Sequence, residues 1–153
     1  MSPLLLILIA RVAYGVAGDI RPVTSTQPRP PASIEDLARD LDNSDRPTRL
    51  LAARELRRRV RVAVKAGGRP GTIAELESRA QLAALTRAAV PACVAALDDP
   101  TTAAPCADIL GRLGEPEACR PLAVAAEFHD GRTARVIDRA IARLGAVCTA
   151  DSR

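Results

Sequence analysis

The sequence predicts an all-α fold, a short α-solenoid of about three antiparallel helix pairs with an extra helix after the first pair. Two observations lead to this expectation. From Ser33 onward, apolar residues recur with the period of a helix and hardly anywhere with the two-residue period of a strand. The chain also matches itself at a shift of 31 residues, which is the length of one short helix pair. Because one pair cannot bury its apolar side alone, the pairs are expected to stack.

The first residues resemble an export signal. Leu4–Ala10 is an apolar run too short to span a bilayer, and small residues at Val16, Ala17 and Gly18 suit a signal-peptidase site. No Lys or Arg precedes the run, so an uncleaved anchor and a disordered start are the alternatives. We expect a signal peptide over residues 1–18.

Composition divides the remaining chain. Four prolines among Ser and Thr predict an extended linker over residues 19–32. The helical domain is expected over 33–147, with a C-terminal tail over 148–153. No run of about 18 apolar residues exists, so we expect no transmembrane span in the mature protein.

Helix boundaries follow from caps and breakers. Ser33, with Asp36 three residues later, resembles a capping box, and Thr72 is a second cap. Gly114 and Gly145 stand where a left-handed residue ends a helix. The expected helices cover 34–41, 48–66, 72–88, 91–97, 102–113, 117–128 and 132–144.

The internal repeat is strongest in the last two pairs. The shift of 31 places Cys106 on Ile137 and the tripeptide 112–114 on 143–145, both Arg-Leu-Gly. Together with Leu97-Asp-Asp-Pro and Glu115-Pro-Glu-Ala, these residues resemble HEAT-type repeats, closest to the short variety named after phycobilisome lyases. The resemblance covers about three units over 33–145 and implies a superhelical stack that binds proteins. A plain three- or four-helix bundle is the alternative.

Four cysteines fit two bridges in an oxidising compartment, and so a secreted or periplasmic protein. Four buried thiols in a cytosolic protein are the alternative. If the repeat is right, Cys93 and Cys106 lie on facing arms of one helix pair, which predicts a Cys93–Cys106 bridge. The same reasoning pairs Cys119 with Cys148, although sequence alone permits three pairings.

A basic ridge is expected on the helix over 48–66, on the face opposite Leu56, Val60 and Ala63. Such a ridge suits an acidic protein or another anionic surface, and a solvated outer face is the plain alternative. Nucleic acid is the less favoured ligand. The ridge consists of Arg54, Arg57, Arg58, Arg61 and Lys65.

The sequence offers no catalytic constellation. His129 is the only histidine, no glycine-rich loop follows a strand, and no His–carboxylate cluster suggests a metal. The two aromatic residues, Tyr14 and Phe128, cannot build a base-stacking platform or an aromatic cage. We therefore expect no enzyme activity, cofactor or metal.

The expected function is that of an exported, non-catalytic protein–protein interaction module with an unidentified protein partner. The alternative is a disulfide-stapled structural or accessory domain that associates with anionic envelope surfaces through the Arg-rich ridge.

Overall fold

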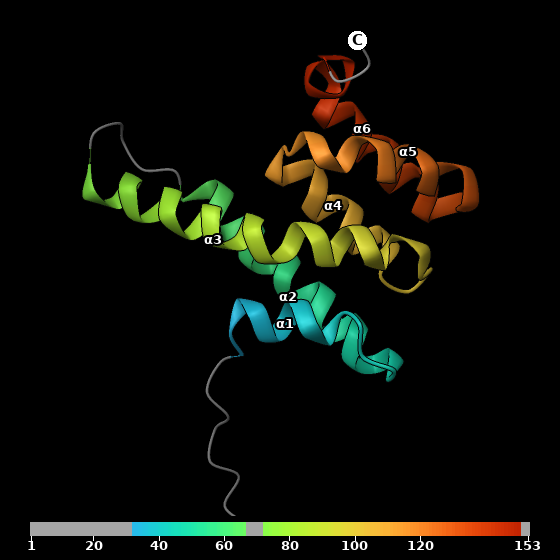
Figure 1. The fold of residues 1–153 in the computed structure, drawn as a ribbon, viewed down its shortest axis with the longest axis horizontal. Helices are drawn as coiled ribbons and strands as arrows, with labels where there is room; N and C mark the ends of the chain where they lie inside the picture. The colour runs from blue at the N-terminus through green and yellow to red at the C-terminus, as the bar shows by residue number, and fades with distance from the viewer. Residues whose placement is uncertain (1–31, 67–71, 151–153) are drawn as a thin grey trace, which may run out of the picture. The chain divides into compact units, whose positions relative to one another are not determined.

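The computed structural model describes residues 32–66 and 72–150, and in these ranges every regular element is a helix (Figure 1). The expected signal peptide, almost the whole of the linker, and residues 151–153 lie outside the described ranges. The described residues belong to one compact unit, Pro31–Arg153.

The first two helices begin at side-chain caps. Ser33 and Asp36 form the predicted capping box before α1 (Ile34–Asp40), each accepting a backbone N–H of the other, at 3.0 and 3.2 Å. Asp45 caps α2 (Arg46–Lys65) by accepting the Thr48 N–H at 3.0 Å. A carboxylate at a helix start also suits the positive end of the backbone dipole. These caps fix where the chain enters each helix.

The third helix differs from the prediction. The expected extra helix over 72–88 and the helix over 91–97 are one element, α3 (Ile73–Ala95), with Pro91 inside it. Proline removes one backbone donor but does not stop a helix whose remaining residues favour it. Here alanine-rich sequence flanks Pro91, and Ala89, Val90 and Cys93 are buried around it. Burial on both sides of the proline therefore keeps the helix continuous.

The C-terminal half alternates short turns and helices. Chain order is η1 (Ala96–Asp98), α4 (Ala103–Leu113), η2 (Pro116–Ala118), α5 (Cys119–Phe128) and α6 (Gly131–Ala150). Gly114 has φ +77° and ψ +19° after α4, so the predicted left-handed position is confirmed there. Gly145 also has a positive φ, +26°, but its ψ of −96° is not that of a left-handed helical residue. Gly145 kinks α6 instead of ending it. Residues 148–150, expected in the tail, therefore belong to α6.

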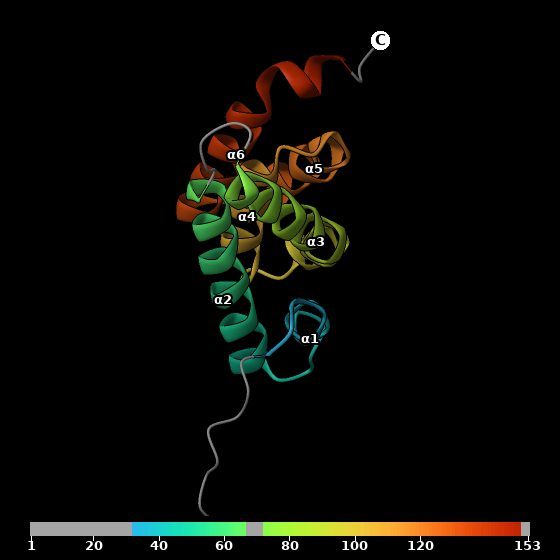
Figure 2. The same cartoon turned by 90° about the vertical axis from the view of Figure 1, so that its left-hand side faces the viewer.

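The helices pack in two layers. In Figure 2, α1, α3 and α5 lie on one side and α2, α4 and α6 on the other. Along the second layer α2 contacts α4 and α4 contacts α6, while α1 contacts α3 and α5 contacts η1 along the first. Apolar side chains meet between the layers, with Leu56, Leu85, Ile109, Leu122 and Ile137 fully buried. The layer α2–α4–α6 carries most of the charged residues considered below.

Within the described ranges, one helical stretch, Ile73–Asp98, is long and apolar enough to cross a membrane, with a mean hydropathy of 1.5 over its most apolar 18 residues. This stretch contacts α1, α2 and α4. Its apolar residues Leu85, Ala89 and Val90 are buried in those contacts. Packing within the fold thus accounts for the hydropathy of its C-terminal half.

Candidate functional site

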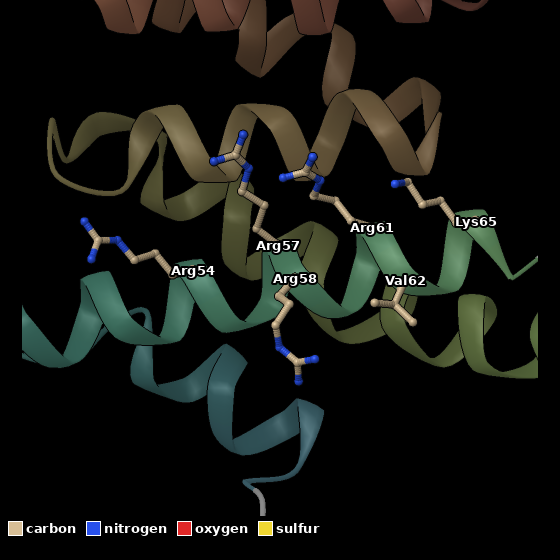
Figure 3. A pocket seen from close by; sticks show the side chains of 6 residues that line it. All are labelled: Arg54, Arg57, Arg58, Arg61, Val62 and Lys65. Atoms are coloured by element: carbon tan, nitrogen blue, oxygen red, sulfur yellow. The ribbon is translucent and has the colours of Figure 1, made fainter.

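The predicted ridge lies on the outer face of α2. Leu56, Val60 and Ala63 are buried on the inner face, as expected, whereas Val64 is 42% exposed. Val64 lies at the edge of the buried face of α2, directly after the buried Ala63. The outer face borders a shallow hollow of about 340 Å³ (Figure 3), lined by Arg54, Arg57, Arg58, Arg61, Val62 and Lys65.

Arg58 is held by a carboxylate of its own helix. Its Nε and Nη2 donate to the two oxygens of Glu55 at 2.8 and 2.7 Å. Arg59, which lies off the ridge, donates to Glu55 at 2.9 Å and to the Ala32 carbonyl oxygen at 2.8 Å. The hydrogen bond from Arg58 is the main reason why the pKa of Glu55 falls from 4.5 to about 2; burial opposes the shift, and Arg59 adds to it. Arg58 and Arg59 therefore share one carboxylate, which offsets one of their two positive charges.

Arg57 extends away from its own helix toward α4. Its Nε donates to Asp108 at 2.6 Å, and the same carboxylate accepts Arg112 Nε at 3.1 Å and Arg143 Nη1 at 2.6 Å. The Asp108 side chain is 5% exposed, while those of Arg57 and Arg143 are 42% exposed and that of Arg112 is 23% exposed. One buried carboxylate thus joins α2, α4 and α6. We name Asp108, Arg57, Arg112 and Arg143 the arginine cluster.

The protonation state of Asp108 follows from these bonds. Burial by itself would raise the pKa of the carboxyl group, because a charged group loses its hydration. The guanidinium groups of Arg143, Arg57 and Arg112 outweigh burial and hold the pKa of Asp108 well below its ordinary range. Asp108 therefore remains an anion at neutral pH, and the arginine cluster has a net charge of +2.

The other three ridge cations have no acidic partner among the described residues. Arg54, Arg61 and Lys65 make no ion pair with any residue in the described ranges. Figure 3 shows that Arg57, Arg61 and Lys65 extend to one side of α2, whereas Arg58 and Val62 extend to the other. Positive charge therefore continues along α2 from the arginine cluster.

Sequence reasoning missed the part of this surface that lies beyond α2. Asp108 is an acidic residue in a helix where seven of eleven residues are buried, which is a signal for a paired buried charge. Arg112 and Arg143 occupy equivalent positions at the shift of 31 residues. Those two signals pointed to the cluster, but only the packing of α2 on α4 shows that Arg57 joins it.

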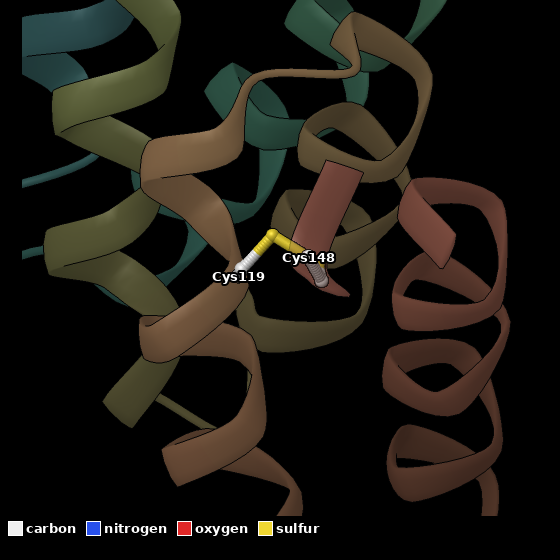
Figure 4. Close-up of a disulfide and its surroundings, with 2 residues drawn as sticks. All are labelled: Cys119 and Cys148. Carbon is white, nitrogen blue, oxygen red and sulfur yellow. A yellow bond between two sulfur atoms is a disulfide. The ribbon is translucent and has the colours of Figure 1, made fainter. Parts of the chain in front are cut away.

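One of the two expected bridges is present. Cys119 and Cys148 form a disulfide with their Cα atoms 5.4 Å apart (Figure 4). The bridge joins the start of α5 to the end of α6, beyond the Gly145 kink. This pairing, expected from the repeat, is seen in the structure.

The other expected bridge, Cys93–Cys106, is not formed: both residues are buried free thiols. Cys93 lies on the buried side of α3 and Cys106 on the buried side of α4, and these two helices pack on each other. The neighbouring Cys106 side chain, together with burial, raises the pKa of Cys93 well above its ordinary value. A protonated thiol is a poor nucleophile, so the raised pKa of Cys93 makes this thiol unreactive in the closed core.

His129 serves the fold. Its Nε2 lies 2.7 Å from the carbonyl oxygen of Leu97, which joins the end of α5 to η1. Among the described residues no group of three or more His, Cys, Asp or Glu side chains is placed to hold a metal ion. Phe128, which precedes His129 in the chain, is 77% exposed and lines a hollow of about 480 Å³ together with Pro100.

The fold and the site define an all-helical protein with a basic surface that spans α2, α4 and α6. Comparisons with protein-family models, with curated proteins and with solved structures found no match to this chain.

Proposed function

We propose that the chain is an exported helical-repeat protein, similar to short HEAT repeats, that acts as a non-catalytic module and binds another protein through its α2–α4–α6 layer. Successive helices of this layer contact one another, as a stack of pairs requires. Gly114 and Gly145, which the repeat aligns, both have positive φ. The aligned residues Cys106 and Ile137 are both fully buried.

One observation carries the binding role. Arg54, Arg61 and Lys65 share a face with Arg57, and no carboxylate in the described part of the chain neutralises the first three. Like charges held side by side repel one another, so an anionic partner would lower the energy of this face. Two further exposed apolar residues of α2, Leu51 and Val62, offer contact area beside the cations.

Export is supported by the Cys119–Cys148 bridge, because disulfides persist in oxidising compartments. The expected signal peptide agrees with that placement. A secreted or periplasmic location is therefore part of the proposal.

A second function rests on the same cations. Arg-rich surfaces also hold proteins at anionic membranes, and Val62, 54% exposed among the cations, could enter the headgroup region. In this case the protein is a structural or accessory domain at the cell envelope, stapled by its disulfide.

Site-specific photo-cross-linking in cells that produce the full chain tests these functions. A cross-linking residue replaces Val62 on α2 or, as the matched control, the exposed Val124 on α5 in the other layer. We expect one discrete protein adduct from position 62, none from position 124, and loss of the adduct when Arg54→Glu and Arg61→Glu are added.

The alternative results are equally clear. Adducts with lipid at position 62 would support the envelope function instead. Equal adducts from both positions, or no adduct from either, would overturn the proposed binding layer.

A further inference from the structure

The arginine cluster has more donors than its own carboxylate uses. Arg57 and Arg112 each bind Asp108 through Nε, and Arg143 binds it through Nη1. The Nη groups of Arg57 and of Arg112 make no hydrogen bond to a described residue, so each of these arginines retains unused N–H donors. Three guanidinium groups around one carboxylate leave a charge of +2 for a further anion.

The donors are fixed before any ligand arrives. Each arginine comes from a different helix, and α4 packs directly on both α2 and α6. Asp108, 5% exposed, holds the three side chains together and offsets part of their mutual repulsion. Binding of a ligand therefore costs less conformational entropy, because the three long arginine side chains are already ordered.

The position of the donors favours a protruding ligand. The side chains of Arg57, Arg112 and Arg143 are 42%, 23% and 42% exposed and converge on Asp108, which is 5% exposed, so their guanidinium groups are gathered around one buried carboxylate. A single Asp or Glu side chain can reach such a convergent group of donors, whereas the headgroups of a flat bilayer are spread over a plane. The planar guanidinium fork also matches the two oxygens of a carboxylate. The exposed Arg54, Arg61 and Lys65 continue the positive surface, which suits several acidic residues in a row.

We propose that the arginine cluster binds a carboxylate of an acidic segment of the partner protein, with Asp108 as the residue that positions the three arginines. This inference rests on the proposed function, because it names the chemistry of the partner for the same layer. The neighbouring α2 cations bind further acidic residues of that segment.

A binding measurement on the purified full chain tests the inference. The probe is a fluorescent hexaglutamate peptide, followed by anisotropy in about 20 mM salt, where surface charges are weakly screened. Arg143→Gln should weaken binding about tenfold, because it removes a charge-assisted contact. Arg143→Lys keeps the charge but loses the fork, so its affinity should lie between those of Arg143→Gln and the unaltered chain.

The matched control is Arg87→Gln on α3. Arg87 is exposed, lies in the other layer, and makes no ion pair within the described ranges, so this change lowers the net charge equally. We expect its affinity to stay within about twofold of the unaltered chain. Circular dichroism shows whether each variant is helical. If Arg143→Gln does not fold, the inference is tested by the peptide affinity of Arg143→Lys, compared with that of the unaltered chain.

Three results would overturn the inference. The first is an equal loss of affinity for the peptide in Arg143→Gln and Arg87→Gln. The second is stronger binding of the chain to vesicles with 30% phosphatidylglycerol than to the peptide. The third is displacement of the peptide by inorganic phosphate at concentrations well below those at which glutamate displaces it. The outcome is separable from the proposed function. A protein adduct at position 62 without peptide binding would contradict only the proposal that the arginine cluster binds a carboxylate. Peptide binding without an adduct would contradict only the proposal that the chain binds a protein in the cell.

Discussion

Arginine has three different electrostatic states within one helix of this protein. Arg58 is chelated by Glu55, Arg57 shares a buried carboxylate with two other arginines, and Arg54 makes no ion pair with a described residue. The residue type is the same, and the difference lies in what each side chain can reach. Only the cations without an internal partner are available at full charge for a ligand.

Glu55 gives the stability of the protein a specific dependence on pH. Its pKa is about 2 in the folded chain and about 4.5 when unfolded, so between these values the unfolded state binds more protons. The stabilising contribution of Glu55 is thus complete above about pH 4.5 and is lost as pH falls toward about 2. Glu55→Gln should lower the free energy of unfolding at neutral pH, and this deficit should vanish near pH 2.

Urea unfolding at several pH values measures the effect of Glu55→Gln. Glu127→Gln is the control, because Glu127 is exposed on α5 and makes no ion pair with the residues described. A deficit that stays constant from neutral pH to about pH 2 would show that the Arg58–Glu55 bond contributes nothing to stability.

At the scale of elements, α4 and α6 approach more closely than their side chains would ordinarily permit. Gly111 lies in this contact, and a Cβ added there would stand 2.7 Å from the Cα and 2.8 Å from the Cβ of Ala140. A glycine inside a helix usually costs about 1 kcal/mol relative to alanine. The close approach of two helices explains why glycine is nevertheless present at this position.

Gly111→Ala should therefore destabilise the protein by about 1–2 kcal/mol, because overpacking outweighs the gain in helix propensity. Thermal and urea unfolding report the change. Adding Ala140→Gly should recover part of the loss in a double-mutant cycle, since it removes one of the two clashing atoms. A rise in the unfolding midpoint of Gly111→Ala would mean that α6 can move away freely.

The positions and ends of the helices were predicted from the sequence far better than the contacts between helices. The caps at Ser33 and Thr72 and the positive-φ glycines at 114 and 145 are local features, so they could be located without a fold. The division of α3 at Pro91 was wrong, because proline is a local signal that burial on both sides overrode. The ridge on α2 was predictable from spacing, whereas the role of Asp108 depends on three helices meeting.

At the scale of the whole molecule, a covalent link closes the C-terminal pair of helices. The Cys119–Cys148 bridge spans 29 residues and ties the segment after the Gly145 kink to α5. In the chain-entropy account, closing a loop of this size stabilises the fold by about 3.5 kcal/mol. For a domain of this size, such a contribution is a large share of the net stability.

Cys148→Ser should lower the free energy of unfolding by about 2–4 kcal/mol, as measured by urea unfolding without reductant. The unaltered chain treated with dithiothreitol is the control and should match the variant, because Cys93 and Cys106 are already thiols. If reduction lowers stability clearly more than the substitution does, a second bridge exists in solution, and the free-thiol state of that pair is wrong.

The amino-acid sequence by itself determined the helical class, the ends of most helices and the basic face of α2. These depend on the helical period and on short-range capping, which act within a few residues of the chain. Tertiary structure alone decided that Arg57 turns to Asp108 and that α3 continues through Pro91. Each of these depends on which groups the packed helices bring within a few ångström of one another and remove from water, and no local pattern encodes that.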